Sequence, residues 1–172
     1  MRKKYFSLLK DLDNKSESMG REKDDKVLIL DGLNNFLRVF AANPALNDDG
    51  DHIGGLVGFL NSLGLLIRTH NPTRLVICFD GKGGSQRRRK VYSDYKENRR
   101  TRVKLNRNLD QTADEEYDSM KVQMTKLGEY LGYLPVTVLS MDNVEADDII
   151  AYCAQNILKK EVVIVSTDRD FY

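Results

Sequence analysis

The chain has 172 residues, of which 41% are hydrophobic and 31% charged, a composition typical of one globular α/β-sized domain. Its net charge is +1, and two cysteines, Cys78 and Cys153, are too few for a disulfide scaffold, which favours a reducing cytoplasm. No apolar run approaches the roughly 20 residues that a membrane-spanning helix needs, and Tyr5–Leu9 is too short for a signal peptide. Extracellular, membrane and cysteine-zinc classes are therefore disfavoured.

The chain opens with a highly charged appendage, residues 1–25, in which we expect one short helix over residues 3–12. Four short apolar runs follow along the chain. Each run is continuous rather than alternating, which is typical of strands covered on both faces of a parallel sheet. The four predicted strands cover residues 27–30, 75–79, 136–139 and 162–165.

Helical periodicity separates these strands. Apolar residues recur every three or four positions, which is the spacing of a core-facing helix stripe. Strands that alternate with helices predict an α/β fold, a doubly wound, mainly parallel sheet with helices on both faces. The three stripes are Leu56, Leu60, Leu63 and Ile67; Tyr117, Met120, Met124, Leu127 and Leu131; and Ile149, Cys153 and Ile157.

One insertion, residues 82–112, fits neither period and interrupts the alternation after the second strand. Between residues 82 and 107 the chain carries eleven Lys and Arg residues against two acids, a net charge of +9, so the remaining residues carry −8. Such a strip indicates a polyanionic partner. Tyr92 and Tyr95 lie inside it, and basic residues interleaved with aromatic ones suit phosphate contacts and base stacking. Nucleic acid is therefore favoured over a solvated, disordered charge run.

Carboxylates gather where the predicted strands end, the edge at which open parallel sheets build their sites. Glu145 and Asp148, three residues apart where a helix opens, are expected to share one helix face with Asp147 beside them. Any single acid can be explained as a helix cap. Seven like charges at one edge repel strongly unless something neutralises them. The seven residues are Asp31, Asp80, Glu145, Asp147, Asp148, Asp168 and Asp170.

Divalent cations supply such neutralisation. Mg²⁺ takes oxygen ligands, keeps several waters and needs only one or two direct carboxylates, and two ions about 4 Å apart promote phosphodiester hydrolysis. Acids beside a basic strip therefore indicate a metal-dependent nuclease. Competing motifs fit less well: the glycine-rich residues 81–85 lack phosphate-loop spacing, and Leu33 stands where an aspartyl phosphatase would have its second aspartate.

Five short motifs occur in a specific order: Leu30-Asp31-Gly32, Phe79-Asp80-Gly81, Tyr95-Lys96-Glu97-Asn98-Arg99, Glu145-Ala146-Asp147-Asp148 and Ser166-Thr167-Asp168-Arg169-Asp170-Phe171. Together they resemble the flap endonuclease/5′–3′ exonuclease superfamily, which has a PIN-like, Rossmann-like fold. They are most similar to the phage 5′ nucleases, such as phage ribonuclease H. The resemblance covers about residues 26–172, the expected nuclease domain, and each motif is specific only in combination with the others.

The resemblance implies two Mg²⁺ or Mn²⁺ ions. Asp31, Asp80, Glu145 and Asp147 would serve the first ion with Asp148 beside them, and Asp168 and Asp170 would serve the second. Residues 82–112 resemble the basic helical arch through or under which a free 5′ end passes. There Lys96 and Arg99 would be the catalytic pair that engages the scissile phosphate, and Tyr95 and Tyr92 would stack on the terminal base. The other expected nucleic-acid contacts are Arg87, Arg88, Arg89, Lys90, Arg100, Arg102 and Lys104.

The implied activity is that of a metal-dependent, structure-selective 5′ nuclease (5′–3′ exonuclease/flap endonuclease) acting on DNA or RNA–DNA replication intermediates. The implied partners are DNA with a 5′ flap or free 5′ end, an RNA–DNA hybrid, and a single-strand-binding protein or sliding clamp. The implied location is the cytoplasm, that of a bacterial host if the chain is phage-encoded.

Family members continue past the Asp168/Asp170 motif with another helix, another aspartate and a helix–loop–helix region, whereas this chain stops at Tyr172. We therefore expect a truncated or split product. Two alternatives stay open: a catalytically incomplete nucleic-acid-binding fragment that needs a second chain, and a PIN-like single-strand RNase, against which the basic strip argues.

Overall fold

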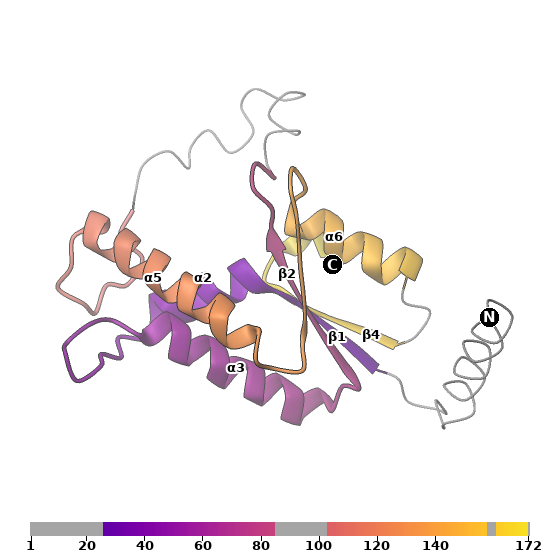
Figure 1. Cartoon of the computed structure of the whole chain (residues 1–172), viewed down its shortest axis with the longest axis horizontal. Helices are drawn as coiled ribbons and strands as arrows, with labels where there is room; N and C mark the ends of the chain where they lie inside the picture. Colours follow the sequence, from indigo (N-terminus) through magenta and orange to yellow (C-terminus); the bar gives the residue numbers. More distant parts are fainter. Residues whose placement is uncertain (1–25, 85–102, 158–160, 172) are drawn as a thin grey trace, which may run out of the picture.

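The computed structural model describes residues 26–84, 103–157 and 161–171 (Figure 1). The helix expected over residues 3–12 and most of the basic strip lie outside the described residues. The described elements are β1 (Lys26–Asp31), α2 (Gly32–Ala42), α3 (Gly54–His70), β2 (Arg74–Asp80), α5 (Ala113–Leu131), β3 (Thr137–Met141), α6 (Ala146–Tyr152) and β4 (Glu161–Val165). A π-helical turn, Cys153–Ile157, continues α6, and a single 3-10 turn, Arg169–Phe171, follows β4.

The strands form one sheet in the order β3-β2-β1-β4. Every pairing is parallel: Leu28 of β1 lies opposite Leu75 of β2 on one side and Val163 of β4 on the other. The carboxyl ends of all four strands therefore meet at the same edge, as Figure 1 shows for β1 and β2. This arrangement confirms the predicted parallel sheet and places the ends of β1 and β2, its two central strands, side by side.

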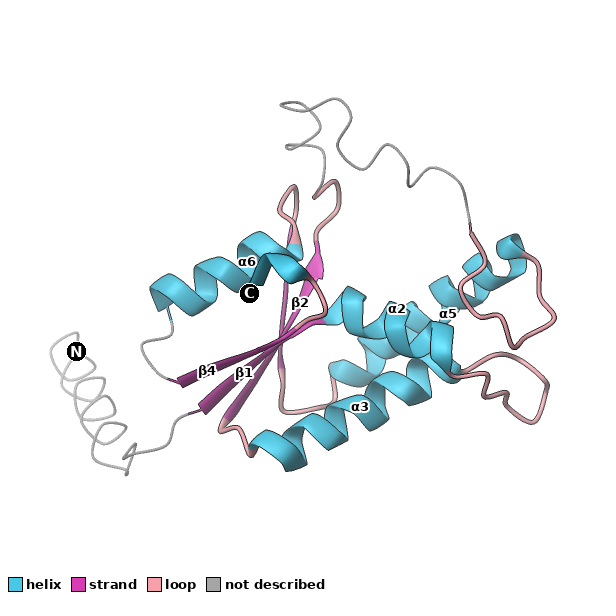
Figure 2. Ribbon diagram, turned by 180° about the vertical axis from the view of Figure 1, so that it is seen from behind, coloured by secondary structure: helices cyan, strands magenta, loops and turns pink. Residues whose placement is uncertain are grey.

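Helices cover both faces of the sheet, which confirms the predicted α/β class (Figure 2). On one face, α2, α3 and α5 pack over alternate strand residues such as Leu30 and Ile77, with the fully buried Phe36, Phe40 and Phe59 between them. On the other face, α6 packs over the intervening strand residues, represented by Ile29, Val76 and Cys78. Because both sides of β1 are buried, its sequence is a continuous apolar run.

The helix boundaries follow from local chemistry. Thr112 and Glu115 form a reciprocal capping box that starts α5, in which each side chain accepts a hydrogen bond from the other's backbone N–H. The α3 helix ends at His70 because Asn71 adopts a left-handed conformation with φ of 44°. The predicted helical stripes correspond to α3, α5 and α6 with its π-helical turn.

Three expectations about these elements were wrong or incomplete. The run at residues 136–139 was expected to be covered on both faces, but β3 is an edge strand with mostly exposed side chains, Val138 among them. Tyr117 and Ile67 are exposed rather than core residues. The whole of α2 was absent from the sequence-based prediction.

Both cysteines are buried and carry free thiols. Burial raises the pKa of the Cys78 thiol to about 12, with smaller contributions from Cys153 and Asp31. Within the part of the chain that the structure describes, no helix is long and apolar enough to cross a membrane.

Candidate active site

Asp31, the last residue of β1, lies at the centre of the carboxyl edge and is 6% exposed. Its Oδ1 accepts a hydrogen bond from the Asn34 N–H at 3.0 Å, which caps α2, and its Oδ2 accepts one from the Ser166 hydroxyl at 3.0 Å. Burial raises the pKa of Asp31, the two hydrogen bonds oppose that rise, and the charges of Asp80 and Asp168 add to it. Two other carboxylates therefore lie within the electrostatic field of Asp31.

Asp80 ends the neighbouring central strand, β2. Its Oδ1 accepts the Ala146 N–H at 2.7 Å, which connects β2 to the first turn of α6. Backbone hydrogen bonds join the same two loops, from Gly81 N to Val144 O at 3.1 Å and from Asn143 N to Lys82 O at 2.9 Å. These contacts bring the motif of Asp80 and the motif of Glu145 together, although the two residues are 65 positions apart in sequence.

The acids at the start of α6 differ from one another in environment. Glu145 precedes the helix with an extended backbone and is 2% exposed, whereas Asp148 is exposed. Glu145 is the N-cap residue and Asp148 the third helical residue, so the expectation that they share one helix face stays a prediction. The pKa of Asp147 is raised to about 6, chiefly by burial and then by the negative charges of Asp31, Asp168, Asp80 and Glu145, in decreasing order.

The last acids lie in the segment after β4. The Asp168 N–H donates to the Ser166 hydroxyl oxygen at 3.1 Å, and the Asp170 N–H donates to Asp168 Oδ1 at 3.2 Å. A further contact was missed from the sequence: Asn34 Oδ1 accepts both the Thr167 N–H at 3.2 Å and the Thr167 hydroxyl at 2.8 Å. The only sequence signal for Asn34 is its place three residues after Asp31, in the first turn of the next helix.

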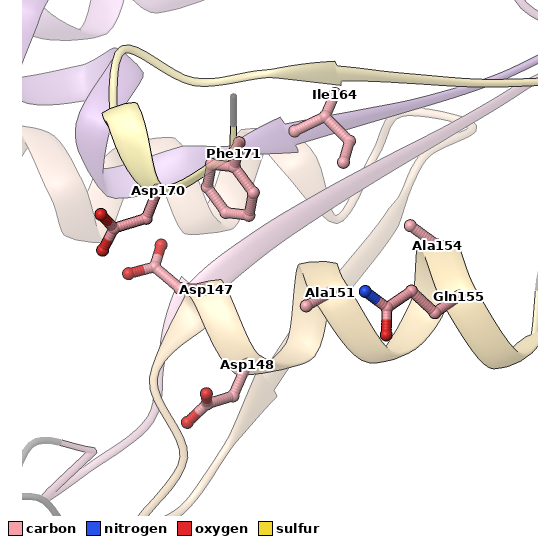
Figure 3. Close-up of a pocket in the computed structure, with 8 residues that line it drawn as sticks. All are labelled: Asp147, Asp148, Ala151, Ala154, Gln155, Ile164, Asp170 and Phe171. Carbon is pink, nitrogen blue, oxygen red and sulfur yellow. The ribbon is translucent and has the colours of Figure 1, made fainter.

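A pocket of about 400 Å³ adjoins this edge, between α6 and the end of β4 (Figure 3). Asp147 and Asp170 point toward one another at one end of it, and Asp148 lies beside them. The opposite end is lined by Ile164, by alanines of α6 and its continuation, and by one polar side chain, Gln155. The pocket therefore joins carboxylates from the fourth and fifth motifs.

All seven predicted acids belong to one group: four of them act electrostatically on Asp147, and Asp148 and Asp170 line the pocket with it. In residues 26–84, 103–157 and 161–171, no three His, Cys, Asp or Glu side chains lie close enough to enclose a metal ion. The arrangement is thus an open array of oxygen donors and not a closed cage. Oxygen donors of this kind fit Mg²⁺ or Mn²⁺, which bind through one or two carboxylates and retain water.

Most of the predicted nucleic-acid contacts are not described by the structure. Lys104, the exception, donates from Nζ to the Leu109 carbonyl oxygen. The other positions lie outside the described residues: Arg87, Arg88, Arg89, Lys90, Tyr92, Tyr95, Lys96, Arg99, Arg100 and Arg102.

The C-terminal end of the basic insertion is anchored to the domain by a buried polar pair that the sequence did not reveal. The Glu116 carboxylate accepts the N–H groups of Leu105 and Asn106, each at 2.7 Å. Asn106 is fully buried, and its Nδ2 donates to the carbonyl oxygens of Phe40 at 2.9 Å and Asn43 at 3.1 Å. Residues 105 and 106 are therefore attached to both α5 and the end of α2.

A parallel sheet with oxygen donors along its carboxyl edge defines an α/β domain with a candidate metal site. Residues 26–172 match the family described as "5'-3' exonuclease, N-terminal resolvase-like domain", and the chain belongs to this family. The 5'-3' exonuclease of Aquifex aeolicus is 34% identical over 145 residues, which are 83% of this chain and 45% of that protein. Flap endonuclease Xni of Shewanella sp. (strain MR-4) is 34% identical over 149 residues, 86% of this chain and 50% of the relative.

The fold is also similar to that of a solved structure, the bacteriophage T5 flap endonuclease in a pseudo-enzyme-product complex with DNA and metal ions. The TM-score is 0.58 at 20% identity, covering 85% of this chain and 50% of the other. This likeness bears on the fold alone. The chain spans about half the length of the curated relatives that it matches.

Proposed function

We propose that the chain carries the metal-binding part of a structure-selective 5′ nuclease, a 5′–3′ exonuclease or flap endonuclease that hydrolyses phosphodiester bonds. The observation that carries the proposal is the meeting of four separate chain segments at one edge, where Asp147 is in the field of Asp31, Asp80, Glu145 and Asp168. Membership of the 5'-3' exonuclease family and relatives named flap endonuclease support the reaction class. The T5 flap endonuclease, a protein of similar fold, was solved with DNA and metal ions, the substrate and cofactor classes proposed here.

Two Mg²⁺ or Mn²⁺ ions are the proposed cofactors. Asp31, Asp80, Glu145 and Asp147, with Asp148 beside them, would hold one ion, and Asp168 and Asp170 would hold the other. Bound divalent ions supply activation of water and stabilisation of the leaving oxygen in phosphodiester hydrolysis. The buried, hydrogen-bonded Asp31 fixes the centre of the donor array, and the neighbouring carboxylates whose charges raise the pKa of Asp147 would equally favour a bound cation there.

The basic residues are the proposed contacts with DNA carrying a 5′ flap or free 5′ end, or with an RNA–DNA hybrid. Lys96 and Arg99 would engage the scissile phosphate, and the anchored residues 105 and 106 would fix where this strip returns to the domain. Replacing Lys96 by alanine should then lower the cleavage rate by about 100-fold, far more than it lowers affinity, because one charge-stabilising donor is lost. A single-strand-binding protein or sliding clamp is proposed from the resemblance of the sequence alone.

The direct test is cleavage of a labelled 5′-flap duplex by the 172-residue chain, in Mg²⁺ and in EDTA. Asp31→Asn and Asp80→Asn should each lower metal-dependent cleavage by at least about 100-fold, because each removes a charged donor from the array, while binding in EDTA persists. Asp118→Asn, an exposed acid paired with Lys121 on α5, is the matched control and should cleave normally. Full cleavage by both site variants would refute the metal role.

The alternative function is nucleic-acid binding without catalysis by this chain alone. This alternative is favoured by the open carboxylate array, in which no three of the described donors enclose an ion. It predicts salt-sensitive binding, as expected when Lys and Arg displace counterions, and no metal-dependent product. Competition between flap DNA and unstructured RNA separates both readings from a single-strand RNase.

A further inference from the structure

Asn34 forms the contact that joins the first acidic motif to the last. It lies in the first turn of α2, and its Oδ1 accepts two hydrogen bonds from one residue, the Thr167 N–H at 3.2 Å and the Thr167 hydroxyl at 2.8 Å. Its own N–H donates to Asp31 Oδ1 at 3.0 Å. One asparagine therefore contacts both the central carboxylate and the residue immediately before Asp168.

Ser166 completes a ring of hydrogen bonds with these residues. Its hydroxyl donates to the second oxygen of Asp31 at 3.0 Å and accepts the Asp168 N–H at 3.1 Å. The hydroxyl has a single hydrogen, so these two bonds fix its direction. The ring runs from Asp31 through Asn34, Thr167 and Ser166 back to Asp31, and it holds the backbone from which Asp168 projects.

The segment that carries Asp168 and Asp170 has few other constraints. β4 is an edge strand that pairs only with β1 in the sheet, and none of its residues is fully buried. Thr167 and Asp170 are exposed. The ring is thus the described structure's main polar link between these two acids and Asp31.

We propose that Asn34 is a positioning residue that sets the affinity of the site for divalent metal by holding Asp168 and Asp170 against Asp31 through Thr167. The inference rests on the proposed function, since it assigns Asn34 to the same metal site. Partners that orient metal ligands typically contribute 10- to 100-fold in metal affinity. Asn34→Leu, of nearly the same size, removes the acceptor and should weaken divalent metal binding by about that factor.

Two further variants separate positioning from packing. Asn34→Asp keeps an oxygen acceptor for both Thr167 donors, so it should bind metal at least as tightly as the wild type. Thr167→Val removes only the hydroxyl donor and leaves the N–H, so its loss should be smaller, within about 10-fold. Because the two groups act through one contact, Asn34→Leu with Thr167→Val should be no weaker than Asn34→Leu alone.

The readout is Mn²⁺ binding to the full chain, followed as the loss of the free Mn²⁺ signal in electron paramagnetic resonance. Asn61→Leu, an exposed asparagine in the middle of α3, makes the same change away from the site and should bind Mn²⁺ normally. Urea unfolding of each variant checks that it folds. If Asn34→Leu fails to fold, the contrast between Asn34→Asp and Thr167→Val still decides.

Wild-type affinity in Asn34→Leu and Thr167→Val, or additive losses in the double variant, would overturn the positioning role. Asp31→Asn tests the proposed function separately. If the wild type binds Mn²⁺ and Asp31→Asn does not, the site stands whatever Asn34 does. If the wild type binds no Mn²⁺, or Asp31→Asn binds it equally well, the proposed metal site and the role of Asn34 both fall.

Discussion

Replacing Glu116 by glutamine should destabilise the domain although the two side chains have nearly the same shape. The Glu116 carboxylate is 2% exposed and accepts two backbone N–H groups at 2.7 Å, from Leu105 and Asn106. Glutamine offers one oxygen and one NH₂ group, so one of the two N–H donors must face another donor. Asn106 is fully buried, so bulk solvent does not reach its N–H.

The magnitude follows from the charge and the burial. A hydrogen bond to a charged group contributes about 1.5–3 kcal/mol net, and a buried donor left unpaired costs about 1–3 kcal/mol. Losing one bond and weakening the other should therefore cost about 2–4 kcal/mol. That loss is a large fraction of the roughly 5–15 kcal/mol by which domains are stable.

Urea unfolding followed by circular dichroism measures the free energy, and amide exchange at Asn106 reports whether the loss is local. Glu115→Gln is the matched control: it is the adjacent residue, it is exposed, and glutamine also completes a capping box. The control should lie within about 0.5 kcal/mol of the wild type. The reasoning fails if Glu116→Gln matches the control in both unfolding and Asn106 exchange.

Three further predictions concern pH, backbone and thiol chemistry. The folded-state pKa of Asp147 is raised to about 6, so Asp147 stabilises the folded state below its unfolded-state pKa, and this stabilisation is lost as pH rises through 6. The melting temperature in EDTA should therefore fall over this range. The same pH profile in Asp147→Asn would contradict the prediction. Gly81→Ala should destabilise the domain by about 2 kcal/mol or more, because a Cβ there would lie 1.7 Å from the Met141 carbonyl oxygen. Gly128→Ala, with open space around it, should be neutral or stabilising in urea unfolding. Equal urea midpoints for the two variants would contradict the crowding at Gly81. Cys78, buried with a thiol pKa of about 12, should resist a thiol reagent at pH 8 until urea unfolds the chain, so rapid labelling in buffer would count against its burial.

The sheet was predictable because its cause is local in sequence. Strands buried on both faces must be continuous apolar runs, and their pairing in parallel requires the helices that the 3.6-residue period reveals. The convergence of Asp31, Asp80 and Asp168 followed from the same rule, since parallel strands share a carboxyl edge. Edge exposure, as in β3, depends on strand order, which a run of apolar residues does not encode.

Helix α2 and the polar contacts were missed for different reasons. The α2 sequence does carry a helical stripe, Leu33, Phe36, Leu37 and Phe40, but it opens with Gly32 and two asparagines, residues of low helix propensity, and the stripe was overlooked. Asn34 with Thr167, and Asn106 with Glu116, are contacts between polar residues with no periodic pattern. Such pairs become visible only when the fold brings their segments together.

The strand order β3-β2-β1-β4 also decides what would happen to a chain cut anywhere within residues 85–102. The first piece would keep β1 and β2 as neighbours, but β3 and β4 of the second piece pair with opposite edges of that central ribbon and never with each other. The second piece therefore cannot form a sheet by itself. Its strands become ordered only when they pair with the two edges of the first piece. The acids divide in the same way, two with the first piece and five with the second, so recovery of metal binding on mixing would report reassembly of the pieces, as in a protein-complementation sensor.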